Sequence, residues 1–122
     1  MDKPHIASFL GLVCWALCHD FAAAGDAVKG EKLFARCSAC HSVDGSRKNG
    51  PTLQGVVGRK AGTTEHVRYS KALAGSNIVW DDASLDAYLE APTKLVRGTT
   101  MTIRIHKPEE RQDLIAYLKT LE

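Results

Sequence analysis

Cys37-Ser38-Ala39-Cys40-His41 is the stretch that decides how this chain folds and what it binds. Two thiols three positions apart, with a histidine directly after the second, form the pattern of a c-type haem attachment site. The two vinyl groups of a haem lie on neighbouring pyrrole rings, so two sulfurs from one short turn can bond to both. His41 then lies beneath the iron, where an imidazole nitrogen is a common axial ligand. The motif predicts one haem c, attached through Cys37 and Cys40.

Three other kinds of site use a similar pair of cysteines. A structural zinc site needs four ligands, and the only other cysteines, Cys14 and Cys18, lie in a segment that we expect to be removed. A thioredoxin-like dithiol belongs in a βαβ pattern, which the sequence lacks. A structural disulfide is compatible with an exported protein, but it leaves His41 without a role. These interpretations stay open at this point.

Residues 1–24 have the pattern of a secretory signal peptide. An apolar stretch, IASFLGLVCWALC at residues 6–18, is followed by small residues before Gly25. The apolar stretch is too short to span a bilayer. The positive charge expected at the start of such a leader is weak here, because Lys3 is offset by Asp2. An uncleaved N-terminal anchor therefore remains the alternative.

Cleavage leaves residues 25–122, a length of 98 residues that suits one small domain. The leader contains one of the 16 basic residues and two of the 14 acidic ones, so the remaining chain has a formal net charge of +3. This small and evenly spread excess does not indicate nucleic acid as a partner. It fits a moderately cationic surface that binds acidic proteins weakly. We expect a monomer in the periplasm, without stable membrane insertion.

Three segments have helical patterns. Residues 26–36 form an amphipathic pattern that runs into the haem motif, and Gly30 should permit close approach by another helix. The partner should be residues 108–121, where apolar residues recur on one face. A third helix is expected at about residues 82–91, and Pro92 ends it. The patterns predict an all-α domain in which the N-terminal and C-terminal helices cross.

Residues 41–80 are rich in glycine and turn residues and show no sustained period. A loop region of this length normally counts against a compact fold. A large apolar cofactor resolves the conflict, because loops and short helices can wrap around a porphyrin and use it as their core.

Met101 is the second candidate ligand. It is the only methionine in residues 25–122 and lies in a polar loop, residues 97–102. Core packing is the usual reason for a methionine. With a haem present, a neutral thioether opposite an imidazole stabilises ferrous iron and raises the reduction potential, as an electron carrier requires. His66 and His106 are rival sixth ligands, and we interpret each as an exposed loop histidine.

With these residues in place, residues 25–122 resemble the class I cytochromes c, in particular the bacterial cytochrome c2 and mitochondrial cytochrome c branch. The likeness rests on the cysteine and histidine motif, GPTLQGVVGR at residues 50–59, Tyr69-Ser70 followed by Trp80, and Tyr88-Leu89-Glu90 leading to Met101. The resemblance implies the small cytochrome c fold and a soluble one-electron carrier rather than an enzyme. In that family, both axial positions of the iron are filled, here by His41 and Met101.

The resemblance also implies roles for residues around the haem. The carbonyl of Pro51 is expected to accept a hydrogen bond from the axial His41. Arg59, Tyr69 and Trp80 are expected to hold and partly neutralise a buried haem propionate, because an unpaired carboxylate in a low-dielectric pocket is costly.

Two hydroxyl groups are expected near the axial sulfur, those of Tyr88 and Thr99, where a hydrogen bond tunes the ligand. Two neighbouring positions depart from the family pattern. Arg97 stands where proline is usual, and Ile103 stands where an aromatic residue commonly covers the haem edge. Because of these departures, the loop that carries Met101 need not be as stiff as it is in the family.

The resemblance further implies respiratory or photosynthetic partners of the cytochrome bc1, oxidase, reaction-centre or dehydrogenase type. Thr93 and Thr100 replace lysines of the mitochondrial docking ring. The basic front that remains consists of Arg36, Lys94, Arg97, Arg104 and Lys107. We therefore expect docking on acidic surfaces that salt weakens and that is looser than in the mitochondrial protein. The rival functions are a sensor or peroxidase-like enzyme with a labile sixth ligand and a membrane-anchored carrier.

Overall fold

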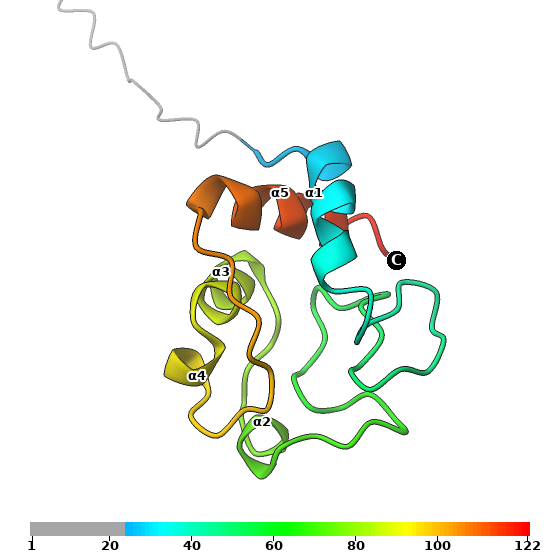
Figure 1. Ribbon diagram of the computed structural model, residues 1–122. Coiled ribbons are helices and arrows are strands. Elements are labelled where there is room, and N and C mark those ends of the chain that lie inside the picture. The colour runs from blue at the N-terminus through cyan, green and yellow to red at the C-terminus, as the bar shows by residue number, and fades with distance from the viewer. Residues whose placement is uncertain (1–23) are drawn as a thin grey trace, which may run out of the picture.

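The computed structural model describes residues 24–122 (Figure 1), so the expected signal peptide lies outside the described residues except for Ala24. The elements in order are α1 (Ala27–Leu33), η1 (Phe34–Arg36), α2 (Lys71–Ala74), α3 (Asp82–Glu90), α4 (Pro92–Leu95) and α5 (Pro108–Leu118). Within the described residues there is no strand, only an isolated bridge between Lys60 and Val79. The predicted all-α class is confirmed. No helix in this part of the chain is long and apolar enough to cross a membrane.

Helices α1 and α5 cross, as predicted, and form the most extensive contact between two helices (Figure 1). Gly30 allows this crossing, since a Cβ atom at this position would lie 2.0 Å from the carbonyl oxygen of Asp113. Asp26 caps α1 by accepting hydrogen bonds from the first free N–H groups of the helix. The backbone N–H of Asp26 also donates to the Asp113 carboxylate at 2.7 Å. The rings of Phe34 and Tyr117, 5.9 Å apart, pack at the same interface.

Helix α3 begins at a reciprocal cap between Asp81 and Ser84. The Asp81 carboxylate accepts from the Ser84 N–H at 2.8 Å, and the Ser84 hydroxyl accepts from the Asp81 N–H at 2.9 Å. The helix packs against α5 and buries Leu85, Tyr88 and Leu89. Helix α3 thereby joins the crossed helices α1 and α5 to α4, which it also contacts.

Two short helices, α2 and α4, are not predicted by the sequence pattern. Each is four residues long, about one turn, which is too short to show a period. Ser70 starts α2 by accepting a hydrogen bond from the Leu73 N–H. Pro92 does follow the end of α3, but it also occupies the first position of α4. Helix α5 ends at Leu118, earlier than predicted.

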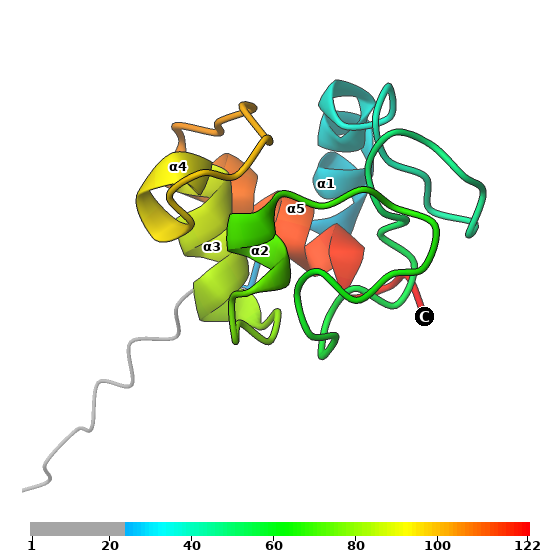
Figure 2. The same ribbon diagram turned by 90° about the horizontal axis from the view of Figure 1, so that it is seen from below.

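The predicted irregular region, residues 41–80, contains only α2 and otherwise consists of loops (Figure 2). Backbone hydrogen bonds between distant positions fix these loops, for example from the Gly58 N–H to the Trp80 carbonyl at 2.7 Å. Residues 96–107 connect α4 to α5 without a helix or strand, and residues 99–107 of this connection are here called the Met101 strap. In both views the loops that follow α1 and the Met101 strap lie on opposite sides of the molecule (Figures 1 and 2).

Candidate functional site

The two cysteines of the motif lie in a tight turn directly after η1. The N–H of Cys37 donates to the Phe34 carbonyl at 2.8 Å, and the N–H of His41 donates to the Cys37 carbonyl at 2.9 Å. Cys37 is buried, Cys40 is exposed, and neither forms a disulfide. Burial raises the pKa of the Cys37 thiol, so it is protonated near neutral pH. Two free thiols in one turn fit addition to the two vinyl groups of a haem.

The imidazole of His41 is fixed by the loop that carries Pro51. Its Nδ1 lies 2.7 Å from the Pro51 carbonyl oxygen, which can only accept, so Nδ1 carries the proton and Nε2 is left for a metal. Burial lowers the pKa of His41, which favours the neutral, metal-binding form; the bond to Pro51 acts in the opposite direction. Gly50 lies behind the ring, where a Cβ atom would be 2.7 Å from Cε1. Sequence reasoning missed this contact, although a glycine directly before Pro51 was a signal for it.

Arg59, Tyr69 and Trp80, the expected propionate-binding residues, are brought together by the loops of residues 41–80. The backbone N–H of Trp80 donates to the Arg59 carbonyl at 3.0 Å. The Arg59 guanidinium donates to the Thr52 carbonyl at 2.7 Å and to the Gln54 carbonyl at 3.1 Å. The Tyr69 hydroxyl accepts from the Thr64 N–H at 3.2 Å, which leaves its own proton to donate. A cation and a hydroxyl donor therefore stand at one place, as a propionate requires.

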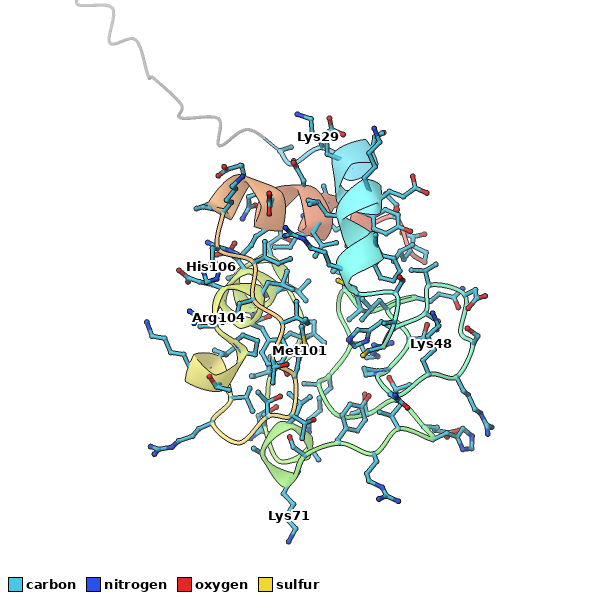
Figure 3. All side chains as sticks on the ribbon, in the orientation of Figure 1. Lys29, Lys48, Lys71, Met101, Arg104 and His106 are labelled. Atoms are coloured by element: carbon cyan, nitrogen blue, oxygen red, sulfur yellow. The ribbon has the colours of Figure 1, made fainter. Side chains whose placement is uncertain are left out.

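Met101 lies half-buried on the strap, toward the centre of the molecule (Figure 3). The two hydroxyl groups predicted near it are beside its backbone. Tyr88 Oη and Thr99 Oγ1 are 2.6 Å apart, and Thr99 Oγ1 also accepts from the Met101 N–H at 3.4 Å. Burial raises the pKa of Tyr88, so its phenol stays protonated, and its ring packs 4.9 Å from the ring of Trp80.

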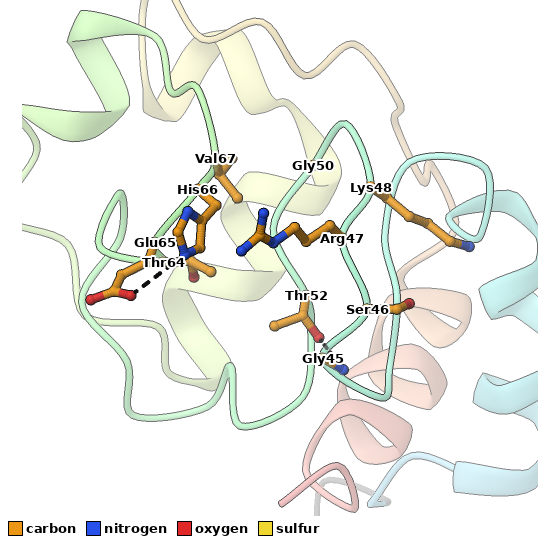
Figure 4. A pocket seen from close by; sticks show the side chains of 10 residues that line it. All are labelled: Gly45, Ser46, Arg47, Lys48, Gly50, Thr52, Thr64, Glu65, His66 and Val67. Atoms are coloured by element: carbon orange, nitrogen blue, oxygen red, sulfur yellow. Dashed lines mark hydrogen bonds and ion pairs between the residues drawn. The ribbon is translucent and has the colours of Figure 1, made fainter.

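The rival histidines lie at the surface. His106 is exposed, and His66 is exposed beside Glu65, with 3.8 Å between Nε2 and the carboxylate. His66 lines a small pocket between two loops (Figure 4), whose volume of about 30 Å³ suits a water molecule and not a porphyrin. Within residues 24–122, no three His, Cys, Asp or Glu side chains gather where they could hold a metal ion. The zinc interpretation therefore lacks its ligand set.

A groove of about 630 Å³ lies between the end of η1, the Met101 strap and the start of α5. It is lined by Arg36, Thr102, Ile103, Arg104, His106, Lys107 and Glu110. Three of the five residues predicted as the basic front are among them; Lys94 and Arg97 are not. Glu110 pairs with Arg36 at 3.0 Å and with Lys107 at 3.5 Å, but ion pairs at a surface are weak. The groove thus combines cationic side chains with an apolar one, Ile103, which is 45% exposed.

The donor set of these residues fits haem c. The turn offers two free thiols and a neutral imidazole with Nε2 available, the strap offers a thioether, and the loops offer a cation and a hydroxyl for a carboxylate. Thiol, imidazole and thioether are the groups that bind haem iron or its vinyl carbons in proteins.

Comparison with known proteins agrees with this chemistry. The model of the family described as cytochrome c matches residues 27–122. The chain is 46% identical over 101 residues to cytochrome c2 of Rhodomicrobium vannielii, covering 80% of this chain and 81% of that protein. It is 45% identical over 100 residues to cytochrome c2 of Agrobacterium tumefaciens, covering 77% and 90%. Among solved structures, cytochrome cH from Methylobacterium extorquens is 48% identical with a TM-score of 0.75, covering 79% of this chain and 99% of that one. The chain therefore belongs to the cytochrome c family of electron carriers, and it binds one haem c covalently through Cys37 and Cys40.

Proposed function

We propose that this chain is a soluble, periplasmic one-electron carrier in which His41 and Met101 are the two axial ligands. Haem c supplies a one-electron couple between ferric and ferrous iron. The observation that carries the proposal is the 2.7 Å hydrogen bond from His41 Nδ1 to the Pro51 carbonyl, because it holds a neutral imidazole with Nε2 available. A thioether as the second ligand leaves no position for a substrate, so we infer a carrier and not an enzyme.

The surrounding residues keep the ligands in place and control charge. Gly50 packs behind the imidazole ring and the Pro51 carbonyl binds its Nδ1, so the ring can keep the same orientation in both oxidation states of the iron. Arg59 and Tyr69 offer a positive charge and a hydroxyl to a propionate. Neutralising that carboxylate removes negative charge from the neighbourhood of the iron, which favours the reduced state and raises the potential.

The groove along the strap supports docking on acidic redox proteins. Its cations attract an acidic surface over a range set by the Debye length, and exposed Ile103 offers a small apolar contact. Partners of the cytochrome bc1, oxidase, reaction-centre or dehydrogenase type have this character. Because the basic front is thinner than in the mitochondrial form, the complexes should be brief.

Maturation and spectra test the proposal as a whole. The chain is exported in a bacterium with a haem-attachment system, and the product is weighed and its visible spectrum recorded. We expect the mass of residues 25–122 plus one haem, sharp reduced bands, and a weak far-red band in the ferric form that reports sulfur ligation. Gly25 is the expected first residue and already packs against the Gln112 backbone of α5. A high-spin ferric spectrum would favour the sensor or peroxidase-like alternative. A mass that retains residues 1–24 would favour the anchored carrier. The bare peptide mass would contradict the soluble carrier and both of these alternatives, because all of them contain haem.

The role of the groove is tested by Lys107→Gln. We expect its rate of electron exchange with purified cytochrome bc1 complex to fall about two- to fivefold at low ionic strength, because steering by charge accelerates association. The loss should disappear near 1 M salt, where the Debye length is about 3 Å. Lys71→Gln removes the same charge from α2, away from the groove residues Arg104 and His106 (Figure 3), and should leave the rate near that of the unaltered protein. Equal losses in the two variants would mean that net charge, and not this groove, directs docking.

A further inference from the structure

The Met101 strap is held at its ends and not along its middle. At its start, the Thr99 hydroxyl bonds to Tyr88 at 2.6 Å. Toward its end, the Ile105 N–H donates to the Leu89 carbonyl at 2.8 Å, and the adjacent Arg104 Nε donates to the Glu90 carbonyl at 3.0 Å. Between these points, within the described residues, the only hydrogen bond of a backbone N–H is the one from Met101 to Thr99 within the strap itself. The position of Met101 therefore depends on how firmly the two ends are held.

Arg111, on α5, holds the far end of the strap from the other side. Its Nη1 donates to the carbonyl of Ile105 at 3.0 Å and to the carbonyl of His106 at 3.1 Å. Ile105 is thus fixed through its N–H to α3 and through its carbonyl to α5, and its side chain is fully buried. Arg111 itself is only 5% exposed, so its charge is largely removed from water.

A buried guanidinium needs a counter-charge, and Asp86 of α3 provides it. Arg111 Nε donates to Asp86 Oδ1 at 2.8 Å, and Gln112 Nε2 donates to the same oxygen at 3.1 Å. The Nε of the guanidinium thereby binds α3, while its Nη1 binds the strap. Helix α3, helix α5 and the strap meet at this single ion pair.

We propose that Arg111 and Asp86 are positioning residues for Met101: their ion pair clamps the end of the strap and so keeps the thioether on the iron. The inference rests on Met101 being the axial ligand, as proposed above. Without the Asp86 charge, Arg111 is drawn toward solvent and releases the carbonyls of Ile105 and His106. The strap then has more conformations available once the sulfur has left the iron, and these favour the detached state.

The test measures detachment directly, by titrating the ferric holoprotein with imidazole at neutral pH. An external ligand binds only where Met101 has left, so its apparent affinity rises with the detached population. Asp86→Asn keeps the shape and one acceptor oxygen but removes the charge. We expect imidazole to bind about tenfold more tightly to this variant, since hydrogen bonds to charged groups contribute at this level. Arg111→Lys, which keeps the charge but not the fork of donors, should change the affinity in the same direction.

Two matched variants separate positioning from general stability. Asp82→Asn removes the other ion pair between α3 and α5, the exposed one with Lys119, which has no contact with the strap. Ile115→Val weakens the buried core of α5. Both variants should bind imidazole with unchanged affinity. Any loss of stability is measured separately, as a lower denaturant concentration at the midpoint of unfolding. The clamp is rejected if Asp86→Asn binds imidazole like the unaltered protein, whether or not the variant unfolds more easily. If the unaltered ferric protein lacks the far-red band, Met101 ligation itself fails, and the clamp fails with it.

Discussion

Met101→Ala is expected to abolish the far-red band of the ferric protein and to lower its midpoint potential by more than about 100 mV, since axial-ligand identity moves haem potentials over about 0.8 V. Alanine has no donor atom, and loss of the neutral thioether removes a ligand that favours ferrous iron. The side chain is half-buried and lies toward the centre of the molecule, whereas the strap's histidine, His106, is exposed (Figure 3). A spectroelectrochemical titration measures both quantities in one sample.

Thr102→Ala is the matched control for this experiment. Thr102 is the next residue of the strap and is exposed, so its truncation should leave the band and the potential unchanged. If Met101→Ala retained both, the sixth ligand would be another residue. His66 and His106 are the histidines to replace in that case, because they are the remaining imidazoles of residues 42–122.

Gly30→Ala should lower the free energy of unfolding of the holoprotein by about 3 kcal/mol, the upper part of the usual range for overpacking. The added methyl group would lie 2.0 Å from the Asp113 carbonyl oxygen and 2.8 Å from the Tyr117 Cβ atom. The first contact is with backbone, which cannot rotate away, so α1 must move off α5. Equilibrium unfolding in guanidinium chloride, followed by circular dichroism, gives the change.

Glu31→Ala serves as the comparison for Gly30→Ala. Glu31 is the next residue of α1 and faces solvent, and alanine is at least as good a helix former. We expect its free energy of unfolding to stay within about 0.5 kcal/mol of the unaltered protein, as is usual at surface positions. Unchanged stability in Gly30→Ala would show that the two helices can separate slightly at no cost, contrary to the packing described here.

Local patterns predicted the long helices well because each buries one face. The helix that starts after Asp26, the one capped at Asp81 and the one that begins at Pro108 all lie where periodicity and caps place them. The one-turn helices α2 and α4 could not be found this way, since a single turn has no period. Their positions depend on a local cap at Ser70 and on Pro92, not on a repeated apolar stripe.

The candidate site divides in the same way. Cys37, Cys40 and His41 are adjacent in sequence, so their spacing alone predicts their chemistry. The roles of Pro51, Arg59 and Tyr88 came from resemblance, because their contacts join residues far apart along the chain, and these roles remain predictions. Lys94 and Arg97 do not line the groove that the other basic residues line, and their part in docking also remains a prediction.

The ion pair of Arg111 and Asp86 was not predicted, although part of it was visible. Arg111 lies three, four and seven positions before Leu114, Ile115 and Leu118, which places it on the buried stripe of the last helix. A charged residue at such a position requires a partner. Nothing in the sequence identifies Asp86 as that partner, because it is separated by 25 positions and lies on a different helix.

The Met101 strap is hydrogen-bonded at its two ends to three consecutive residues of α3: to Tyr88 at its start, and to Leu89 and Glu90 toward its end. A rigid-body tilt of that helix displaces both ends together and leaves the separation between them constant. Thermal motion of the scaffold therefore does little to stretch or slacken the span that carries the sulfur.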